Sequence, residues 1–178
     1  WLSRYGDVKT LSLYREIKNR IRVDEMPIMR LSRELSDEAE VYEAIVTADD
    51  DDPEIQRQLK GISLLGANAL LPATLSAFMV GDTNQQKDML RALVTLYIRH
   101  TIVGGLENAK LEQLVFRIAR DVRGSRNFAA AISAARSFAP SDEDFRRNLI
   151  SVGIPRSGAA RFILREIEMA KRPVESEI

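Results

Sequence analysis

The segment Gly61–Gly81, GISLLGANALLPATLSAFMVG, is the longest stretch of the chain without a charged residue. Its length is close to the ~20 apolar residues with which a single helix crosses a bilayer, so a membrane span is one interpretation. Polar side chains, three glycines and Pro72 count against one continuous span. Because proline is best placed in the first turn of a helix, we predict one helix that ends near Ala67 and another that begins at Leu71 or Pro72. The two are expected to form a buried hairpin.

The second of these helices carries a strip of small residues. Ala73 and Ala77 lie one turn apart, with Ala69 just before them, which lets a neighbouring backbone approach closely. No segment alternates apolar and polar residues with β-branched enrichment, so we predict no sheet. We therefore predict an all-α fold, a single irregular bundle of about eight or nine helices around a central apolar hairpin that spans residues 61–104.

The other helices follow from apolar residues at helical spacing and from residues that favour helix ends. They are expected at about 10–21, 27–46, 53–67, 83–102, 111–123, 128–138, 141–152 and 155–171. The helix 83–102 is apolar over most of its circumference, which predicts a place in the middle of the bundle. Asp82 or Thr83 is expected to cap it, and Gly104 with Gly105 to end it. Gly124 is expected to end the helix 111–123.

Three amphipathic patterns predict which faces are buried. In the helix that Pro27 opens, the expected apolar stripe consists of Leu31, Leu35, Ala39, Tyr42 and Val46. In the last helix, the residues expected to be buried are Ala160, Ile163, Leu164 and Ile167. In the helix 141–152, they are Phe145, Leu149 and Val152. The arginines of the helix 111–123 (Arg117, Arg120 and Arg123) are expected on its polar side.

Length and composition narrow the class of protein. A chain of 178 residues has the size of one ordinary domain. It has no Cys, which excludes a disulfide framework, a thiolate nucleophile and a Cys-based zinc site. With no secretory signal peptide at its start, we expect a reducing compartment, the cytoplasm. Because it begins at Trp1 and stops at VESEI, we expect residues 1–178 to be one helical domain of a longer chain, with residues 1–10 as a linker from a missing N-terminal domain.

The net charge of zero hides a gradient along the chain. Residues 1–89 hold 11 Lys and Arg against 16 Asp and Glu, whereas residues 90–178 hold 15 against 10, so the halves carry −5 and +5. In the second half 13 of the 15 cations are Arg, which pairs with phosphate or carboxylate through a planar fork. Two interpretations stay open: a solvated helical surface with internal ion pairs, and a nucleic-acid-binding surface, although no basic run or interleaved aromatics accompany the arginines.

Other candidate sites are weak. The acidic run Asp49–Asp52 invites a metal-site interpretation, but a calcium loop needs a glycine at its turn and a bidentate Glu, and neither is present. We interpret these carboxylates as favourable charges before a helix that opens at Pro53. His100, the only histidine, lies among apolar neighbours and is expected to be a hydrogen-bonded core or interface residue. The patterns GxxxxGK[ST], GxGxxG, HExxH and GxSxG are absent. We assign no catalytic, cofactor-binding or metal-binding residue.

Four stretches in this order carry a family resemblance: WLSRYGDVKTLSLYREIK with the later ELSDEAEVYEAI, then LLPATLSAFM, then LRALVTLYIRHTIVGG, and AARFILREIE. The chain resembles the helical middle of the GmrSD-type restriction endonucleases, bacterial phage-defence proteins with an N-terminal ParB-like nucleotide-hydrolase domain and a C-terminal HNH nuclease domain. The likeness spans nearly the whole chain through apolar, degenerate motifs. The DGQQR-type motif of the hydrolase and the EHI-type motif of the nuclease are absent, so no catalytic residue of the family falls on this sequence.

The resemblance implies a helical scaffold and coupling domain of a modification-dependent DNA restriction endonuclease. It would link the hydrolase to the nuclease and have no chemistry of its own, while the parent protein would use an NTP and a divalent metal. Its partners would be the flanking domains of the same chain and, through the parent, DNA. Arg156, Arg161 and Arg165 are the expected phosphate contacts because they lie in and just before the last helix. The alternative is a stand-alone helical protein–protein interaction module, with docking or self-association between its acidic and basic halves. An unrecognised helical enzyme is a third interpretation.

Overall fold

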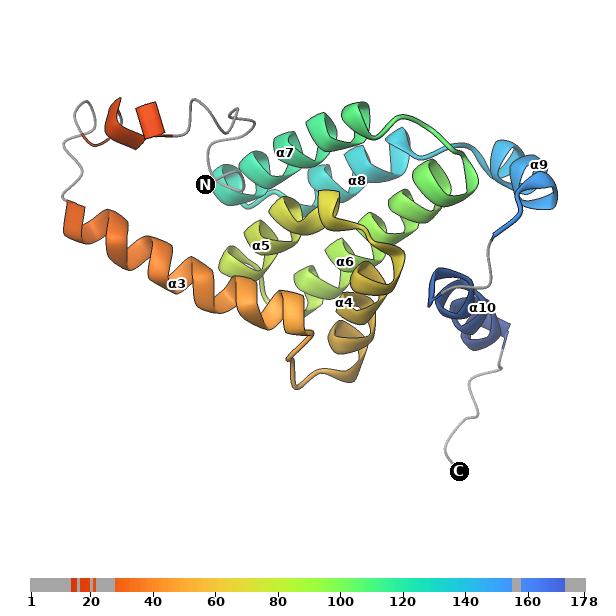
Figure 1. The fold of residues 1–178 in the computed structure, drawn as a ribbon, viewed down its shortest axis with the longest axis horizontal. Helices are drawn as coiled ribbons and strands as arrows, with labels where there is room; N and C mark the ends of the chain where they lie inside the picture. Colours follow the sequence, from red (N-terminus) through yellow and green to blue (C-terminus); the bar gives the residue numbers. More distant parts are fainter. Residues whose placement is uncertain (1–13, 16, 20, 22–27, 155–157, 172–178) are drawn as a thin grey trace.

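The computed structural model describes residues 14, 15, 17–19, 21, 28–154 and 158–171, and in these residues it has helices and no strand (Figure 1). The helices in chain order are α3 (Ile28–Thr47), α4 (Pro53–Leu65), the 3₁₀ turn η1 (Asn68–Leu70), α5 (Leu71–Val80), α6 (Thr83–Tyr97), the π-helix η2 (Ile98–Val103), α7 (Asn108–Ser125), α8 (Phe128–Phe138), α9 (Asp142–Ser151) and α10 (Gly158–Lys171). The all-α prediction is confirmed. The predicted helix 10–21 lies largely outside the described residues.

The uncharged stretch folds into the predicted break between two helices. α4 ends at Gly66, whose left-handed backbone (φ 65°, ψ 28°) lets its N–H and that of Ala67 reach the last carbonyls of the helix. After the turn η1, α5 begins with Pro72 in its first turn, where no hydrogen bond needs its missing N–H. Proline and glycine therefore set the two helix ends that the sequence predicts.

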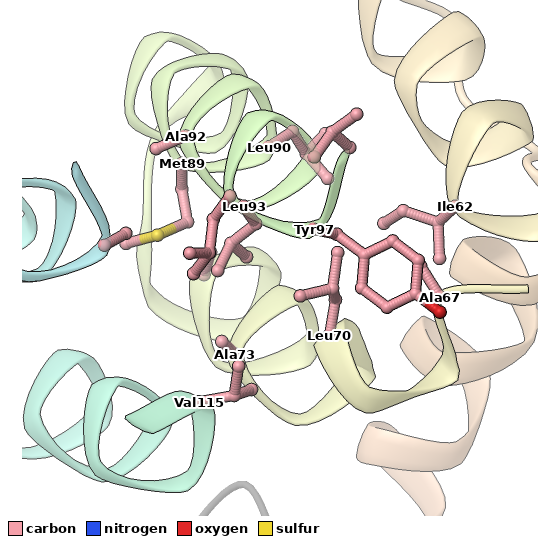
Figure 2. Close-up of a cluster of buried hydrophobic side chains, with 14 of the residues drawn as sticks. Ile62, Ala67, Leu70, Ala73, Met89, Leu90, Ala92, Leu93, Tyr97 and Val115 are labelled. Carbon is pink, nitrogen blue, oxygen red and sulfur yellow. The ribbon is translucent and has the colours of Figure 1, made fainter. Parts of the chain in front are cut away.

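The small-residue strip of α5 is the site of its closest packing. α5 packs mainly on α7, and both Ala73 and Ala77 are completely buried. Figure 2 shows Ala73 beside Val115 of α7. Short side chains thus bring two helix backbones together in the centre of the bundle, as the spacing predicts.

α6 occupies the middle of the bundle, between α4, α5 and α8 (Figure 1). Asp82 caps it and forms a capping box with Gln85. The ring of Tyr97 lies near Ala67 and Leu70 (Figure 2), and its hydroxyl donates to the carbonyl of Gly66 over 3.4 Å. The long central helix changes character at its end, because residues 98–103 form a π-helix rather than the last α-helical turns that we predicted.

Two aromatic rings pack against the glycines at the two ends of the uncharged stretch. A Cβ on Gly61 would lie 2.6 Å from Cε2 of Phe162, and a Cβ on Gly81 would lie 2.6 Å from Cζ of Phe128. Phe162 belongs to α10 and Phe128 begins α8, and both rings are buried. Two later helices therefore dock where the central segment has no side chain.

The predicted buried face of α3 is right at Leu31, which is buried, and wrong at the other four positions. Leu35, Tyr42 and Val46 are 42–49% exposed and Ala39 is exposed, while Ile45 faces the core with Leu31. Glu38, expected on the polar side, is buried in an ion pair with Arg123 of α7, which was also expected to face solvent. This pair fixes the rotation of α3, because a carboxylate is buried at acceptable cost only beside an opposite charge.

The predicted buried face of α10 is right at Ile163 and wrong at two other positions. Ile163 is buried together with Phe162 and Ala160 is half-buried, whereas Leu164 and Ile167 are 65% and 41% exposed, contrary to the prediction. In α9 the described side chains are at most half-buried, so the three residues expected in the core lie at its edge. α7 continues through Gly124 and ends at Ser125. No described helix is long and apolar enough to cross a membrane.

Candidate nucleic-acid interface

α10, which carries two of the three predicted phosphate contacts, packs antiparallel on α4 (Figure 1). Its first residue, Gly158, lies so close to Leu64 that an added Cβ would be 2.9 Å from the leucine Cδ2. One turn later Phe162 rests on Gly61, and after one more turn Glu166 reaches Arg57. The two helices therefore run in opposite directions, and residues of α4 contact one face of α10 along three turns.

The predicted arginines lie beside this docking face and not in it. Arg161 and Arg165 are exposed, are one turn apart on α10, and make no ion pair with any described residue. Arg156 lies outside the described residues. Two guanidinium groups on one exposed helix face form a surface on which phosphates can bind. Arg161 and Arg165 therefore lie next to each other on the exposed surface of α10.

The seam between α4 and α10 is polar at the end where Glu166 meets α4, beyond the buried ring of Phe162. Arg57 Nε lies 3.3 Å from Glu166 Oε1, and Gln58 Nε2 donates to Glu166 Oε2 over 3.4 Å. Three atoms of this seam are buried and have no hydrogen-bond partner of good geometry among the described residues: Arg57 Nε, Gln58 Oε1 and Glu166 Oε1. The contact between the two helices therefore combines the apolar packing of Phe162 with an ion pair and a hydrogen bond at Glu166.

Ion pairs continue from this seam to the central helix. Glu54 lies between Arg57 of α4, at 3.9 Å, and Arg91 of α6, whose Nε donates to Glu54 Oε1 over 2.6 Å. Arg91 also contacts Asp88, at 3.3 Å. The hydrogen bond from Arg91 to Glu54 raises the pKa of the guanidinium, so it stays charged. A chain of charges thus connects α10 through α4 to α6.

The acidic run before α4 acts as predicted. Asp52 caps α4 by accepting hydrogen bonds from the backbone N–H groups of Glu54 and Ile55, at 3.0 and 3.2 Å. Lys87 lies 2.6 Å from the other carboxylate oxygen, and this hydrogen bond is the main cause that lowers the pKa of Asp52. Among the described residues, no group of three or more His, Cys, Asp or Glu is arranged to hold a metal ion.

His100 is buried, as expected of a core histidine. Its ring stacks on Phe138 of α8 with 5.4 Å between the centroids, and Nδ1 lies 3.4 Å from the hydroxyl of Thr101. Burial lowers the pKa of His100, so the neutral imidazole is favoured. The histidine therefore contributes packing at the π-helix and carries no charge near neutral pH.

A second set of arginines was not found from the sequence. Arg91 and Arg99 of the central helix and Arg136 of α8 line one groove between the two helices. Sequence analysis places Arg91 and Arg99 on the narrow polar strip of the central helix, but the two helices are separated by about thirty residues of sequence, and periodicity within one helix cannot show which other helix it meets. The eight-residue spacing of Arg91 and Arg99 is the one signal in the sequence that points to this surface.

Comparison with known proteins adds no relative. No protein-family model, no curated protein and no solved structure matches the chain. The candidate interface is therefore defined by its geometry: a terminal helix with two exposed arginines, an aromatic ring seated on a glycine, and a polar seam with a chain of ion pairs behind it.

Proposed function

We propose that this chain is a helical scaffold and coupling domain of a DNA restriction system, which contacts DNA phosphates through α10 and passes the effect to the bundle through α4. The polar seam between α4 and α10 carries this proposal. Glu166, which contacts Arg57 and Gln58 of α4, directly follows Arg165 in the sequence, so a phosphate bound to Arg161 and Arg165 changes the electrostatic environment of the seam.

The wider setting of the proposal comes from the family resemblance. In a GmrSD-type endonuclease the chain would connect a nucleotide hydrolase to an HNH nuclease, and the NTP and divalent metal would bind those flanking domains. The coupling domain itself would carry no catalytic residue. A role in cytoplasmic phage defence follows from the same resemblance. The ion pairs that run from Glu166 through Arg57 and Glu54 to Arg91 supply a physical route across the domain.

Salt-titrated binding of the chain to a labelled DNA duplex tests the contact. We expect binding to weaken as salt rises, because each phosphate contact releases counterions, with a slope of about −0.9 per contact. Changing Arg161 and Arg165 to Glu should abolish binding. The matched control changes Arg117 and Arg120, two exposed arginines one turn apart on α7, to Glu. Equal loss in both double variants would show only a general charge effect and would refute the α10 interface.

The alternative function, a helical interaction module, is favoured by one observation. Leu35, Tyr42 and Val46 form an exposed apolar stripe on α3, and no described residue covers it. Such a stripe is a typical contact surface for another helix. Sedimentation equilibrium of the chain and of the variant Tyr42→Lys tests self-association. A concentration-dependent dimer that the substitution abolishes would favour this alternative, and a monomer at all concentrations would count against it.

A further inference from the structure

The groove between α6 and α8 has the composition of an anion-binding site. It encloses about 330 Å³, and its lining combines Arg91, Arg99 and Arg136 with the hydroxyl of Thr95 and otherwise apolar side chains. The described residues that line it include no carboxylate. Alanines lie on both walls of the groove. This surface is distinct from α10 and from the interface proposed above.

The three guanidinium groups are spread along the groove. Arg91 and Arg99 are eight residues apart on the same side of the central helix, which corresponds to about 12 Å at 1.5 Å per residue. Arg99 donates to the carbonyl of Pro140 over 2.9 Å, and Pro140 comes four residues after Arg136 in the sequence. Arg136, near the C-terminal end of α8, lines the opposite wall of the groove.

Two of the arginines are held in place by their own partners. Arg91 binds Glu54 and Asp88, while Arg99 binds Asp142 and lies over the ring of Phe145, with 5.0 Å from its Cζ to the centroid. A guanidinium has five N–H donors, so each retains donors for a further ligand. The carboxylates that hold them do not line the groove.

Arg136 distinguishes this groove from a purely structural ion-pair cluster. It is exposed and has no ion pair with any described residue, so its donors are open to a ligand. Arg99 lies within the π-helix η2 that ends the central helix. The groove thus combines one arginine without an ion pair with two that are held by their partners.

We propose that the groove binds a small molecule through a polyphosphate group, that is, two or more linked phosphoryl groups. Because the three arginines come from separate positions along the groove and from both walls, two or three linked phosphoryl groups can contact more of them than a single phosphate can. Guanidinium groups match phosphate oxygens in bidentate geometry, and one arginine without a partner beside two fixed ones gives a preorganised site. This goes beyond the DNA contact on α10, because neither helix of the groove carries Arg161 or Arg165.

Isothermal titration of the 178-residue chain with sodium tripolyphosphate and with inorganic phosphate tests the proposal. We expect saturable binding of one tripolyphosphate per chain, at least about tenfold tighter than that of phosphate, and about tenfold weaker in Arg136→Gln, since a hydrogen bond to a charged group contributes about 1.5–3 kcal/mol. The control Arg120→Gln changes an exposed arginine of α7 and should bind like the unchanged chain. Because Arg136 has no ion pair with described residues, its variant should keep the thermal stability of the unchanged chain.

Three results would overturn the proposal. The first is the absence of saturable tripolyphosphate binding, and the second is equal weakening by Arg136→Gln and Arg120→Gln, which would show attraction to charge alone. The third is that a DNA duplex displaces tripolyphosphate, and does so equally well from the unchanged chain and from the variant in which Arg161 and Arg165 are Glu. That result would assign the groove to a nucleic-acid backbone. The outcome is independent of the α10 interface, since that double variant leaves the groove residues intact.

Discussion

At the scale of single residues, the end of α7 shows how a neighbouring element determines a helix boundary. The sequence predicts an end at Gly124, yet the left-handed residue is Arg126, with φ 54° and ψ 25°. Asn127 accepts a hydrogen bond from Ala130 N–H and so caps α8. The chain must therefore change direction at Arg126, immediately before Asn127. Gly124 stays helical, although glycine adopts the left-handed conformation more easily than arginine does.

Substitutions at these two positions test this boundary. Gly124→Ala should raise the free energy of unfolding by about 0.5–1 kcal/mol, because a helical glycine is less favourable than alanine and no atom lies within 4 Å of an added Cβ. Arg126→Gly should also stabilise, because it removes a left-handed conformation that costs an ordinary residue about 1–2 kcal/mol. Urea unfolding measures both changes. If Gly124 were the end of the helix, Gly124→Ala would destabilise instead.

His100 makes stability depend on pH near neutrality. Burial lowers the pKa of the folded imidazole below the unfolded value of about 6.5, so the unfolded chain binds the proton more readily. The stability contributed by the neutral ring is complete above that value and is lost as pH falls through it. Asp52 and Asp142, whose pKa values are lowered by Lys87 and Arg99, lose their contribution only at lower pH, once carboxyl groups of the unfolded chain begin to bind protons.

We therefore expect the free energy of unfolding to fall between pH 7 and pH 5 in the unchanged chain and to be nearly constant in His100→Gln. The absolute stability of the variant is not the readout, because the amide packs differently against Phe138. Urea titrations at intervals of half a pH unit give the two slopes. Parallel slopes would show that His100 is not the group that titrates.

At the scale of elements, the interior helices are well predicted and the terminal ones are not. The buried side chains of α7 lie at helical spacing (Leu111, Leu114, Val115, Ile118, Ala119 and Val122), and α8 has the predicted bounds. α3 and α10 instead turn a less apolar face inward. Periodicity within a helix identifies its most apolar stripe. Which face docks is decided by the ion pair between Glu38 and Arg123 for α3 and by the packing of Phe162 on Gly61 for α10. Both depend on partners distant in sequence.

The packing of Phe162 on Gly61 predicts a substitution that weakens the docking of α10. Gly61→Ala improves helix propensity in α4 by up to about 1 kcal/mol, but its Cβ meets the ring of Phe162, and overpacking costs about 1–3 kcal/mol. We expect hydrogen-exchange protection of α10 to fall while that of α5 and α7 is unchanged. The double variant Gly61→Ala, Phe162→Leu should restore it.

Gly124→Ala is the matched control, because it adds the same methyl group to a helical glycine with open space around it. It should leave α10 protection unchanged. Equal protection of α10 in Gly61→Ala and in the unchanged chain would mean that the docking of α10 does not depend on the packing of Phe162 on Gly61.

At the scale of the whole molecule, the uncharged segment organises the bundle and the charged residues surround it. The sequence predicts this core and the exposure of Arg161 and Arg165. It does not predict the polar seam of Arg57, Gln58 and Glu166, because these residues come from segments over 100 positions apart. The functional account depends on that seam, which only the packing of α10 on α4 creates.

The most direct test of the coupling proposal is hydrogen exchange of the chain with and without a DNA duplex at low salt. The account predicts that DNA changes amide protection in α10 and also in α4, and that Glu166→Gln, which weakens the seam to Arg57, keeps the change in α10 but loses that in α4. A change confined to α10 in the unchanged chain would contradict coupling, and no change in either helix would contradict the DNA contact itself.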